Sequence, residues 1–490
     1  MSIHQKEFKQ SLGLLDSTMI VIGSMIGSGI FIVSADIART VGSPGMLLAV
    51  WLITGFITLT AALSYGELAG MMPHAGGQYV YLREAYNPFI GFLYGWTVFT
   101  VIQTGTIAAV AVAFAKFTAV LFPWFSEQHI LVSIVGLNVS AAQILAIVSI
   151  VVLTAINLTG IEEGKIVQNI FTFAKIFALL AVIFLGLFIA RNAEAVSANF
   201  SNFWAANWTT VKNGKILSIE SLAGWKLIAA IGVAMVGSLF SSDAWNNITF
   251  TAGEVINPKK NIPLSLAIGT GIVTVIYLLT NIAYLVVLPL VGNPDAPDVI
   301  GRGIQFAASD RVCTATVSVI YGETAAVGMA ILIMISTFGC NNGLILSGAR
   351  VYYAMAKDNL FFKKAGELNS HAVPSWALIV QAVWASLLCL SGSYGDLLDY
   401  VIFAVLIFYI LTVGGIFILR RKQPLAERPY KALGYPVIPA IYIALAALIC
   451  AILLIYKPAF TWPGLGIVAS GIPVYYVWKK FMSKHSTTRG

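Results

Sequence analysis

Two short motifs interrupt apolar stretches that are otherwise typical of membrane-spanning helices. The first is Gly27-Ser28-Gly29, and the second is Phe240-Ser241-Ser242-Asp243-Ala244-Trp245. Glycine is unfavourable inside a helix and relaxed outside one, so the first motif favours local unwinding. Backbone groups that unwind in lipid need other partners. A zwitterionic amino acid supplies them, because its carboxylate can accept from N–H groups and its ammonium can donate to carbonyls at the broken ends.

Each motif also has a structural alternative. We expect the N–H groups of Ser28, Gly29 and Ile30 to receive the carboxylate, but small residues in this pattern also allow close helix packing. A charge at the bilayer centre costs roughly 2.5–3.5 kcal/mol, so Asp243 should face a cavity or a partner. The alternative there is a kink with a buried, hydrogen-bonded aspartate. Phe240 and Trp245, which flank Asp243, are either lids or simple packing residues.

A lysine lies deep in a third apolar stretch. Lys175, within IFTFAKIFALLAVIF, is too far from either end of the stretch to snorkel easily. A buried ammonium needs acceptors. Carbonyls freed at the first interrupted helix, and hydroxyls such as those of Ser336 or Thr337, could supply them. The lysine would then act electrostatically as a bound sodium ion does; the alternative is a structural ion pair, with Asp243 as the partner.

The elements that position these residues follow from composition. The chain has 490 residues, of which 58% are hydrophobic and only 10% are charged, whereas soluble chains carry about 25% charged residues. A spanning helix needs about 20 mostly apolar residues. Candidate spans are 14–38, 44–72, 88–122, 139–160, 166–190, 225–256, 262–291, 323–357, 374–393, 397–420, 436–456 and 460–482. We therefore expect an all-α polytopic membrane protein with about twelve transmembrane helices.

Lysine and arginine set the expected orientation. With both termini inside, most of these residues between the spans fall on the inner side. This predicts a multi-pass protein of the inner, cytoplasmic membrane of a cell, with both termini cytoplasmic. The inner segment 73–87 is expected to form a short amphipathic helix at the membrane interface. Gln103, Asn341 and Asn342 could line a cavity or form interhelical hydrogen bonds.

The sequence lacks the motifs that other classes of function require. The histidines fall in expected loops or termini, and no phosphate-binding GxxxxGK[ST] loop is present. The four cysteines are scattered without CxxC spacing. The basic residues form short clusters and no nucleic-acid-binding stripe. We therefore expect no catalytic residue, no metal and no cofactor, and the sequence indicates no partner chain.

The two interrupted segments lie five spans apart, an odd offset that would invert the second copy in the membrane. Paired interrupted helices in corresponding halves point to the binding site of a transporter. Longer motifs add a resemblance: IGSMIGSGIFI, PHAGGQYVYLREAYNPFIGFLYGW, FTFAKIFAL, SSDAWNNITFTAGEVINPKKNIP, NGLILSGARVYYAMAKDNLF and RPYKALGYPVIP. With these motifs the chain resembles the amino acid–polyamine–organocation superfamily, and within it the L-type amino acid transporter branch.

This resemblance implies a LeuT-type fold in a single domain, 1–490, with helices 1 and 6 discontinuous. The inverted repeats would be 14–190 and 225–420, followed by two accessory helices within 436–482. It also implies that backbone at Ser28 and Gly29 captures the carboxylate, and that carbonyls around Met25, Phe240 and Asp243 capture the ammonium.

The resemblance also assigns roles outside the breaks. Phe240 matches an aromatic gate, Asn246 matches a polar position near the site, and Lys175 matches a lysine at the sodium position of sodium-independent bacterial members. Many relatives have glycine where this chain has Asp243 and Ala244. The expected substrate-binding set is Met25, Gly27, Ser28, Gly29, Ile30, Phe240, Ser241, Ser242, Asp243 and Asn246; the sodium-site mimic is Lys175 with Ser336 and Thr337; the gates are Phe240 and Trp245.

The function expected from these features is sodium-independent exchange of neutral L-amino acids by alternating access. The expected partners are the amino acid and the lipid bilayer. A proton-coupled or cationic amino acid or polyamine carrier, in which Asp243 reads the additional positive charge, stays open. A membrane amino-acid sensor is an alternative of another class.

Overall fold

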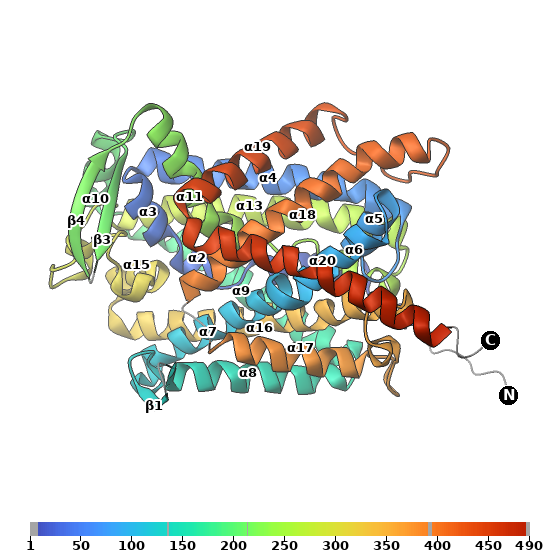
Figure 1. Cartoon of the computed structure of the whole chain (residues 1–490). Helices are drawn as coiled ribbons and strands as arrows, with labels where there is room; N and C mark the ends of the chain where they lie inside the picture. The colour runs from blue at the N-terminus through green and yellow to red at the C-terminus, as the bar shows by residue number, and fades with distance from the viewer. Residues whose placement is uncertain (1–7, 135–136, 213, 391–393, 487–490) are drawn as a thin grey trace.

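The structure is a computed structural model that describes residues 8–134, 137–212, 214–390 and 394–486. Helices dominate it, and most of them run roughly along one common axis (Figure 1). Among the described residues, ten helical stretches are long and apolar enough to cross a membrane: Leu14–Ile32, Pro44–Met71, Pro88–Leu121, Ala141–Leu158, Gly164–Ile189, Gly224–Ser241, Pro258–Val287, Thr324–Lys357, Leu397–Lys422 and Val437–Tyr456. Two further helices occupy the remaining expected positions: the shorter Ser375–Leu388, and Pro458–Ser486 with prolines inside it. The count of twelve spans and the inverted repeat stay predictions.

Before residue 190, the described residues form nine α-helices. They are α1 (Leu14–Met25), α2 (Gly29–Ile32), α3 (Ser34–Val41), α4 (Pro44–Met71), α5 (Gln78–Ala85), α6 (Pro88–Thr97), α7 (Gln103–Leu121), α8 (Ala141–Leu158) and α9 (Ile161–Phe184). A π-helical turn, Val98–Ile102, joins α6 to α7, and another, Leu185–Ile189, extends α9. A 3₁₀ turn, Pro123–Phe125, follows α7.

The other helices follow from residue 193 onward. They are α10 (Ala193–Ser201), α11 (Gly224–Ser241), α12 (Asn247–Phe250), α13 (Pro258–Val287), α14 (Val299–Arg302), α15 (Val312–Tyr321), α16 (Glu323–Lys357), α17 (Ser375–Leu388), α18 (Tyr394–Lys422), α19 (Val437–Tyr456) and α20 (Pro458–Ser486). Short 3₁₀ turns cover Ala252–Glu254, Ala308–Asp310 and Lys363–Gly366.

Two antiparallel hairpins, which the sequence analysis does not anticipate, cover one end of the bundle. Strands β1 (Ile130–Ile134) and β2 (Leu137–Ser140) form the first, and β3 (Asn207–Lys212) and β4 (Lys215–Ser221) form the second. Both lie at the left of Figure 1, the hairpin end, whereas α5 lies at the right, the α5 end. The β-branched residues of β3 and β4 favour strands over the loop expected there.

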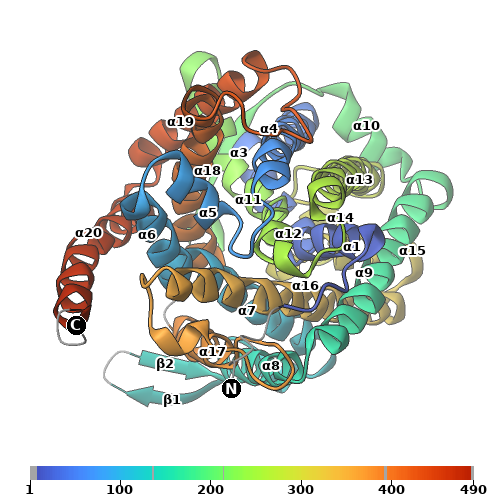
Figure 2. The ribbon, with the colours of Figure 1, turned by 90° about the vertical axis from the view of Figure 1, so that its right-hand side faces the viewer.

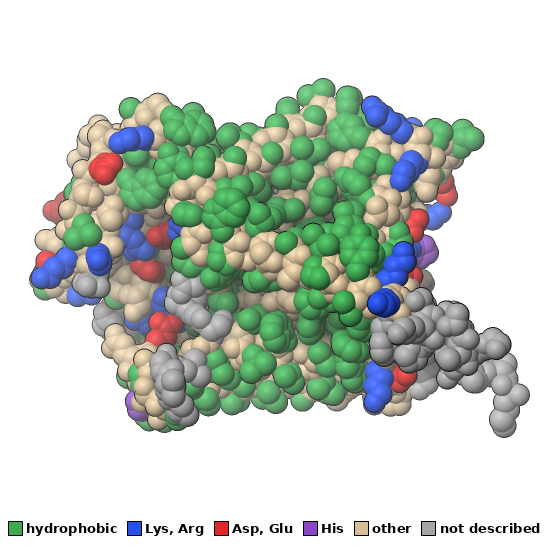
Figure 3. Space-filling view, viewed as in Figure 1, with side chains coloured by type: hydrophobic (Ala, Val, Ile, Leu, Met, Phe, Trp, Pro, Cys, Tyr) green, Lys and Arg blue, Asp and Glu red, His purple; other side chains and the backbone are tan. Residues whose placement is uncertain are grey.

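The surface between these two ends is apolar. Hydrophobic side chains form a band across the middle of the molecule, and charged side chains gather at its two ends (Figure 3). Helix α9 illustrates the pattern, because Ile170, Phe173 and Phe177 are exposed while Thr172 and Lys175 on its other face are fully buried. Such a band fits contact with lipid tails, so the chain is a multi-pass membrane protein.

The interrupted helices occupy the interior. Helix α1 packs against α9, α13 and α16, and α11 packs against α3, α4 and α18. The view from the α5 end shows α1, α11 and α12 surrounded by the other helices (Figure 2). The two breaks are therefore shielded from lipid by protein, as unwound backbone in a membrane requires.

The two ends of the bundle are packed differently. At the α5 end, Glu254 and Arg350 form a buried ion pair with a 2.9 Å contact, and Leu12 pairs with Val255 through a backbone bridge. At the hairpin end, a hollow of about 410 Å³ reaches down to Val33 of the first interrupted helix. The structure is thus open toward the hairpin end and tightly packed at the α5 end.

Helix α5 lies in the segment where a short helix is expected. Its residues Gln78, Tyr79, Tyr81 and Leu82 are buried in the protein, so the helix packs on the bundle, and its position at the membrane interface stays a prediction. Burial and the neighbouring Asp358 carboxylate raise the pKa of Tyr79. Its hydroxyl therefore stays protonated and donates to Asp358 at 2.7 Å. The helix plugs the α5 end and brings Gln78 toward the second break.

Candidate substrate site at the two helix breaks

The first break lies where the glycines predict it. Helix α1 ends at Met25, Ile26 leaves the helical region with φ −76° and ψ 86°, and α2 begins at Gly29. The Gly27 N–H turns back to the Met25 carbonyl at 2.9 Å. Because this segment is non-helical, several of its carbonyls need partners from other helices.

Lys175 supplies the principal hydrogen-bond donors for these carbonyls. Its Nζ atom donates to the Gly23 carbonyl at 2.8 Å and to the Ile26 carbonyl at 2.7 Å, and the side chain is completely buried. The ammonium therefore holds the end of α1 through two charge-assisted hydrogen bonds. Among the residues that the structure describes, no ion pair joins Lys175 to Asp243.

The two hydroxyls expected near Lys175 behave differently. The Ser336 hydroxyl lies 3.3 Å from the carbonyl oxygens of Ile26 and Gly27, so it serves the break. The Thr337 hydroxyl donates to carbonyls of its own helix, such as that of Ile333 at 3.0 Å. The geometry thus groups Ser336 with Lys175 and leaves Thr337 outside their hydrogen bonds.

The second break follows α11. This helix ends at Ser241, Ala244 takes a left-handed conformation with φ +62°, and α12 begins at Asn247. A non-glycine residue in this conformation costs of order 1–3 kcal/mol, which the surrounding packing must offset. The interruption again lies within the motif that the sequence analysis selects.

The two breaks touch each other at a glycine. A Cβ atom on Gly29 would lie 2.0 Å from the Ser241 Oγ and 3.0 Å from the Ser241 Cα, and one on Gly27 would lie 3.0 Å from the Cys340 Sγ. In this conformation the glycines therefore permit close helix packing, which is the structural alternative. Ser28 and Ile30 are likewise fully buried. A carboxylate-binding role for the N–H groups stays a prediction.

Tyr277 of α13 links the breaks, and the sequence analysis misses it. Its hydroxyl lies 3.0 Å from the Met25 carbonyl and 2.9 Å from the Ser241 carbonyl. Farther along the same face, Asn281 accepts from Ser34 at 2.6 Å and Tyr284 donates to the Ile30 carbonyl at 3.2 Å. Polar residues at i, i+4 and i+7 of an apolar helix were the available signal.

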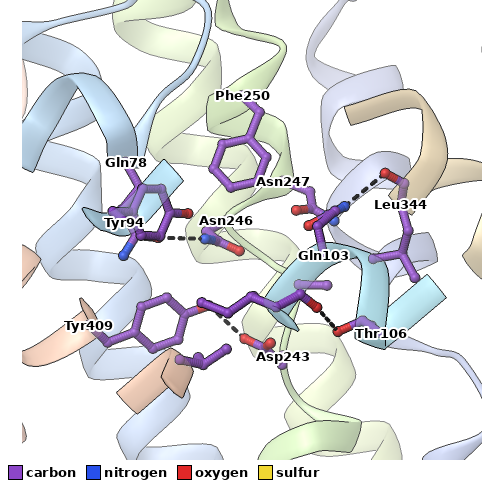
Figure 4. A pocket seen from close by; sticks show the side chains of 13 residues that line it. Gln78, Tyr94, Gln103, Thr106, Asp243, Asn246, Asn247, Phe250, Leu344 and Tyr409 are labelled. Carbon is purple, nitrogen blue, oxygen red and sulfur yellow. Dashed lines mark hydrogen bonds between the residues drawn. The ribbon is translucent and has the colours of Figure 1, made fainter. Parts of the chain in front are cut away.

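A small polar cavity adjoins the second break (Figure 4). Asp243 and Asn246 line it, together with Gln78, Tyr94, Ile102, Gln103, Thr106, Ala244, Asn247, Phe250, Leu344, Val405 and Tyr409. The Tyr409 hydroxyl donates to Asp243 at 2.5 Å, so the aspartate is buried and hydrogen-bonded. Of the expected binding residues, only Asp243 and Asn246 line this cavity; those of the first break lie outside it.

A π-helical turn positions two of the lining side chains. The turn Val98–Ile102 inserts an additional residue before Gln103, and such turns are frequent at functional sites. The Gln103 side chain donates to the Leu344 carbonyl at 2.8 Å, and Thr106 donates to the Ile102 carbonyl at 2.6 Å. Gln103 therefore both lines a cavity and joins two helices. Asn342 joins helices by donating to the Gly164 carbonyl at 3.0 Å, and Asn341 is buried in the same helix, α16.

The expected gate residues are packed in this conformation. Trp245 meets Tyr65 edge-on with a 4.7 Å centroid separation and lies 5.2 Å from the Tyr409 ring. Phe240 is buried beside the end of α11. Ser242, Asp243 and Trp245 line a second small cavity together with Tyr442. These contacts describe packing, and the gating roles stay predictions.

The arrangement suits binding. The described residues contain no group of three histidine, cysteine or acidic side chains that could hold a metal ion. What the site offers is freed backbone at two breaks, one buried ammonium and one buried carboxylate. These groups can hold and orient a small polar molecule at mid-depth of the bundle.

Known proteins are similar to this chain in sequence over nearly its whole length. The family model for the amino acid permeases matches residues 12–478. The serine/threonine exchanger SteT of Bacillus subtilis (strain 168) is 30% identical over 475 residues, which cover 96% of this chain and 97% of SteT. The large neutral amino acids transporter small subunit 2 of Homo sapiens is 28% identical over 471 residues, covering 96% of this chain and 80% of that protein. The b(0,+)-type amino acid transporter 1 of Mus musculus is 26% identical over 488 residues, covering 97% and 90%. A membrane bundle with two broken helices and a match of this extent lead to one conclusion: the chain belongs to the amino acid permease family, whose members are transporters and not enzymes.

Proposed function

We propose that this permease exchanges neutral L-amino acids across a cytoplasmic membrane without sodium. The observation that carries the proposal is the position of the Lys175 ammonium, 2.8 and 2.7 Å from the carbonyl oxygens of Gly23 and Ile26. Carbonyls at the end of a broken helix attract a cation. A covalently attached ammonium is always available there, so no sodium ion is needed.

The substrate's backbone would lie at the two breaks. Its carboxylate would meet N–H groups at the start of α2, and its ammonium would meet carbonyls at the end of α11. In the present conformation the Tyr277 hydroxyl occupies the carbonyls of Met25 and Ser241. An incoming ammonium competes with this single hydroxyl, so binding would loosen the contact between the breaks. That change links occupancy to movement.

The different packing of the two ends supports alternating access. The hollow at the hairpin end leads toward Val33 and Gly237, beside the breaks. The α5 end is held by buried contacts such as Glu254–Arg350. We assign the hairpin end to the outside and both termini to the cytoplasm. The names of two relatives, an exchanger and a large neutral amino acids transporter, support exchange and neutral substrates.

Counterflow in proteoliposomes tests this function. Vesicles that contain the purified chain are loaded with an unlabelled amino acid, and the entry of labelled amino acids is followed across a panel, in sodium and in choline buffers. We expect rapid entry only in loaded vesicles, at equal rates in the two buffers. Entry into empty vesicles that a proton gradient drives would contradict exchange.

One observation favours a second candidate. Asp243 places a carboxyl group within the site, hydrogen-bonded to Tyr409 at 2.5 Å. A carboxyl group there could bind the additional positive charge of a cationic amino acid or polyamine, or could carry a proton. Lysine, arginine and putrescine belong in the panel for this reason. Their preferential entry, or entry driven by a pH gradient, would replace neutral exchange by this candidate.

A further inference from the structure

We propose that a hollow at the hairpin end, between segment 292–322 and the ends of two spanning helices, binds the phosphate group of a membrane phospholipid. Its volume is about 130 Å³, roughly ten times the space that one water needs by the same measure. Its polar lining residues are Arg302, Arg311, Thr314 and Ser318, and the others are alanines and valines. None of them belongs to either helix break, so this inference does not depend on exchange.

The hollow holds positive charge without a carboxylate. Arg302 and Arg311 line it, and no aspartate or glutamate among the described residues does. Asp310, the neighbour of Arg311 in the chain, instead pairs with Arg39 at 2.8 Å. Glu127 and Arg311 both line a larger neighbouring hollow, but within the described part of the chain no ion pair joins them. Two guanidinium groups that share a hollow without a carboxylate favour the binding of an anion.

The surroundings of Arg311 point the same way. Its side chain is only partly exposed, and burial lowers the pKa of the guanidinium with no carboxylate to oppose the effect. An arginine stays charged in a protein, so a bound anion would offset the cost of removing this charge from water. The Arg311 Nε atom donates to the Ala308 carbonyl at 3.3 Å. The N–H groups of its two terminal nitrogens are left for a ligand.

Two further side chains supply donors. Arg302 donates through Nε to the Ala296 carbonyl at 2.8 Å and through one terminal nitrogen to the Pro297 carbonyl at 3.1 Å. These bonds fix the side chain and leave N–H groups on both terminal nitrogens. The Thr314 Oγ atom is buried and has no hydrogen-bond partner among the described residues. A phosphate group has several acceptor oxygens, so it can accept from more than one of these side chains at once.

The start of helix α15 adds to this set. Arg311 is the residue before its first turn and makes no side-chain cap, and Thr314 lies within that turn. The backbone N–H groups at the start of a helix attract a negative charge. The helix terminus and the two arginines therefore favour the same kind of ligand.

The position of the hollow favours a phospholipid over free phosphate. Val120 and Ala326 come from the ends of the spanning stretches Pro88–Leu121 and Thr324–Lys357, and α15 lies at the hairpin end of the bundle (Figure 1). Val327, the next residue of α16, is exposed. The hollow thus lies where the apolar band meets the charged end of the molecule, and basic pockets at this depth suit lipid headgroups.

The melting temperature of the purified full chain in detergent tests the proposal. It is measured against rising concentrations of short-chain phosphatidylglycerol, of diacylglycerol with the same chains but no phosphate, and of inorganic phosphate at constant ionic strength. A ligand that binds the folded state raises the melting temperature. We expect phosphatidylglycerol to act at concentrations about tenfold lower than the other two compounds, which corresponds to one hydrogen bond between charged groups.

Variants of Arg311 locate the site. Arg311→Gln removes the charge, so we expect about tenfold more phosphatidylglycerol to be needed for the same rise in melting temperature. Arg311→Lys keeps the charge but loses the planar fork of N–H groups, and should need an intermediate amount. Arg191→Gln, which changes an exposed arginine that follows α9, is the matched control and should respond as the parent does.

Each outcome supports or overturns the proposal. Equal effects of phosphatidylglycerol and diacylglycerol would mean that the phosphate contributes nothing, and would overturn it. Inorganic phosphate that acts at concentrations as low as those of phosphatidylglycerol would assign the hollow to free phosphate and overturn the lipid source. A parent-like response of Arg311→Gln would contradict the location. The comparison of ligands uses the unaltered chain, so it does not depend on whether a variant folds.

Discussion

Both helix breaks interrupt apolar stretches of the sequence, but the side chains that surround them in the fold differ. At the first break, other helices supply donors to the freed carbonyls of Gly23 and Ile26: the Lys175 ammonium for both, and the Ser336 hydroxyl for Ile26. At the second break, Asp243 and Asn246 turn into a cavity and are held by side chains that line it. One break is braced by a buried ammonium, and the other borders a small polar cavity.

This difference assigns separate tasks to the two breaks. A braced break keeps its shape whichever substrate is present, so it suits the backbone that all amino acids share. A break beside a cavity would contact the side chain of the substrate, which differs between amino acids. We therefore expect changes at the first break to reduce transport of every substrate alike, and changes at the second break to alter the choice among substrates.

Lys175→Ala should have the largest effect. It removes two charge-assisted hydrogen bonds of about 1.5–3 kcal/mol each, so we expect counterflow of all substrates to fall about 100-fold. Lys226→Ala is the control, because that lysine is exposed near the start of α11 and pairs with Glu220 at 3.6 Å. Rates are measured at equal amounts of folded protein in the vesicles. Transport by Lys175→Ala at the parent rate would contradict the role of Lys175 in bracing the first break.

Gly29→Ala should rank second. The new Cβ would lie 2.0 Å from the Ser241 Oγ, so the breaks must move apart. Overpacking typically costs about 1–3 kcal/mol, which predicts roughly a tenfold loss of counterflow. The double variant Gly29→Ala/Ser241→Gly should regain most of it, because the opposing side chain is gone. A double variant as slow as the single one would instead indicate a direct role for Gly29 in binding.

Asp243→Asn should change selectivity more than rate. Asparagine keeps the shape of the side chain but removes the carboxylate that lines the cavity. We expect competition by serine relative to alanine to change about fivefold, equivalent to about one hydrogen bond. Alanine counterflow serves as the internal reference. An equal loss of counterflow for all substrates would give Asp243 the same task as the first break. It would contradict the assignment of separate tasks to the two breaks.

Ser336→Ala should have the smallest effect. The contacts of this hydroxyl with the Ile26 and Gly27 carbonyls are long, at 3.3 Å. Lys175 still holds the Ile26 carbonyl in the variant, so we expect a loss of about twofold or less. Thr337→Ala is the neighbouring control, since that hydroxyl serves its own helix. A larger loss in Thr337→Ala than in Ser336→Ala would contradict the grouping of Ser336 with Lys175.

The sequence could predict the breaks and Lys175 because few physical explanations exist for such residues in apolar stretches. A Gly-Ser-Gly triplet, an aspartate and a lysine each conflict with a lipid-facing helix, so each marks an interior site. The all-helical membrane fold follows from composition for the same reason. These features depend on local chemistry, which the sequence contains.

Tyr277, Tyr409 and Gln78 could not be selected in this way. Tyrosine and glutamine are common in membrane helices and near their ends, and their partners lie far away in the chain. Gln78 contacts Asn246 and Thr412 only because α5 is buried, whereas its amphipathic sequence favours the interface. The hairpins were missed for a related reason, since short strands of polar and β-branched residues resemble an outer loop. These features depend on tertiary packing.

In the proposed mechanism, Lys175 braces the first break, and exchange therefore needs no sodium. The most direct measurement is counterflow of labelled serine into serine-loaded vesicles, in sodium and in choline buffers, with the unaltered chain and with Lys175→Ala. We expect equal rates in both buffers for the unaltered chain and a rate about 100-fold lower for the variant. A rate in the unaltered chain that rises with sodium, or a variant as fast as its parent, would contradict it.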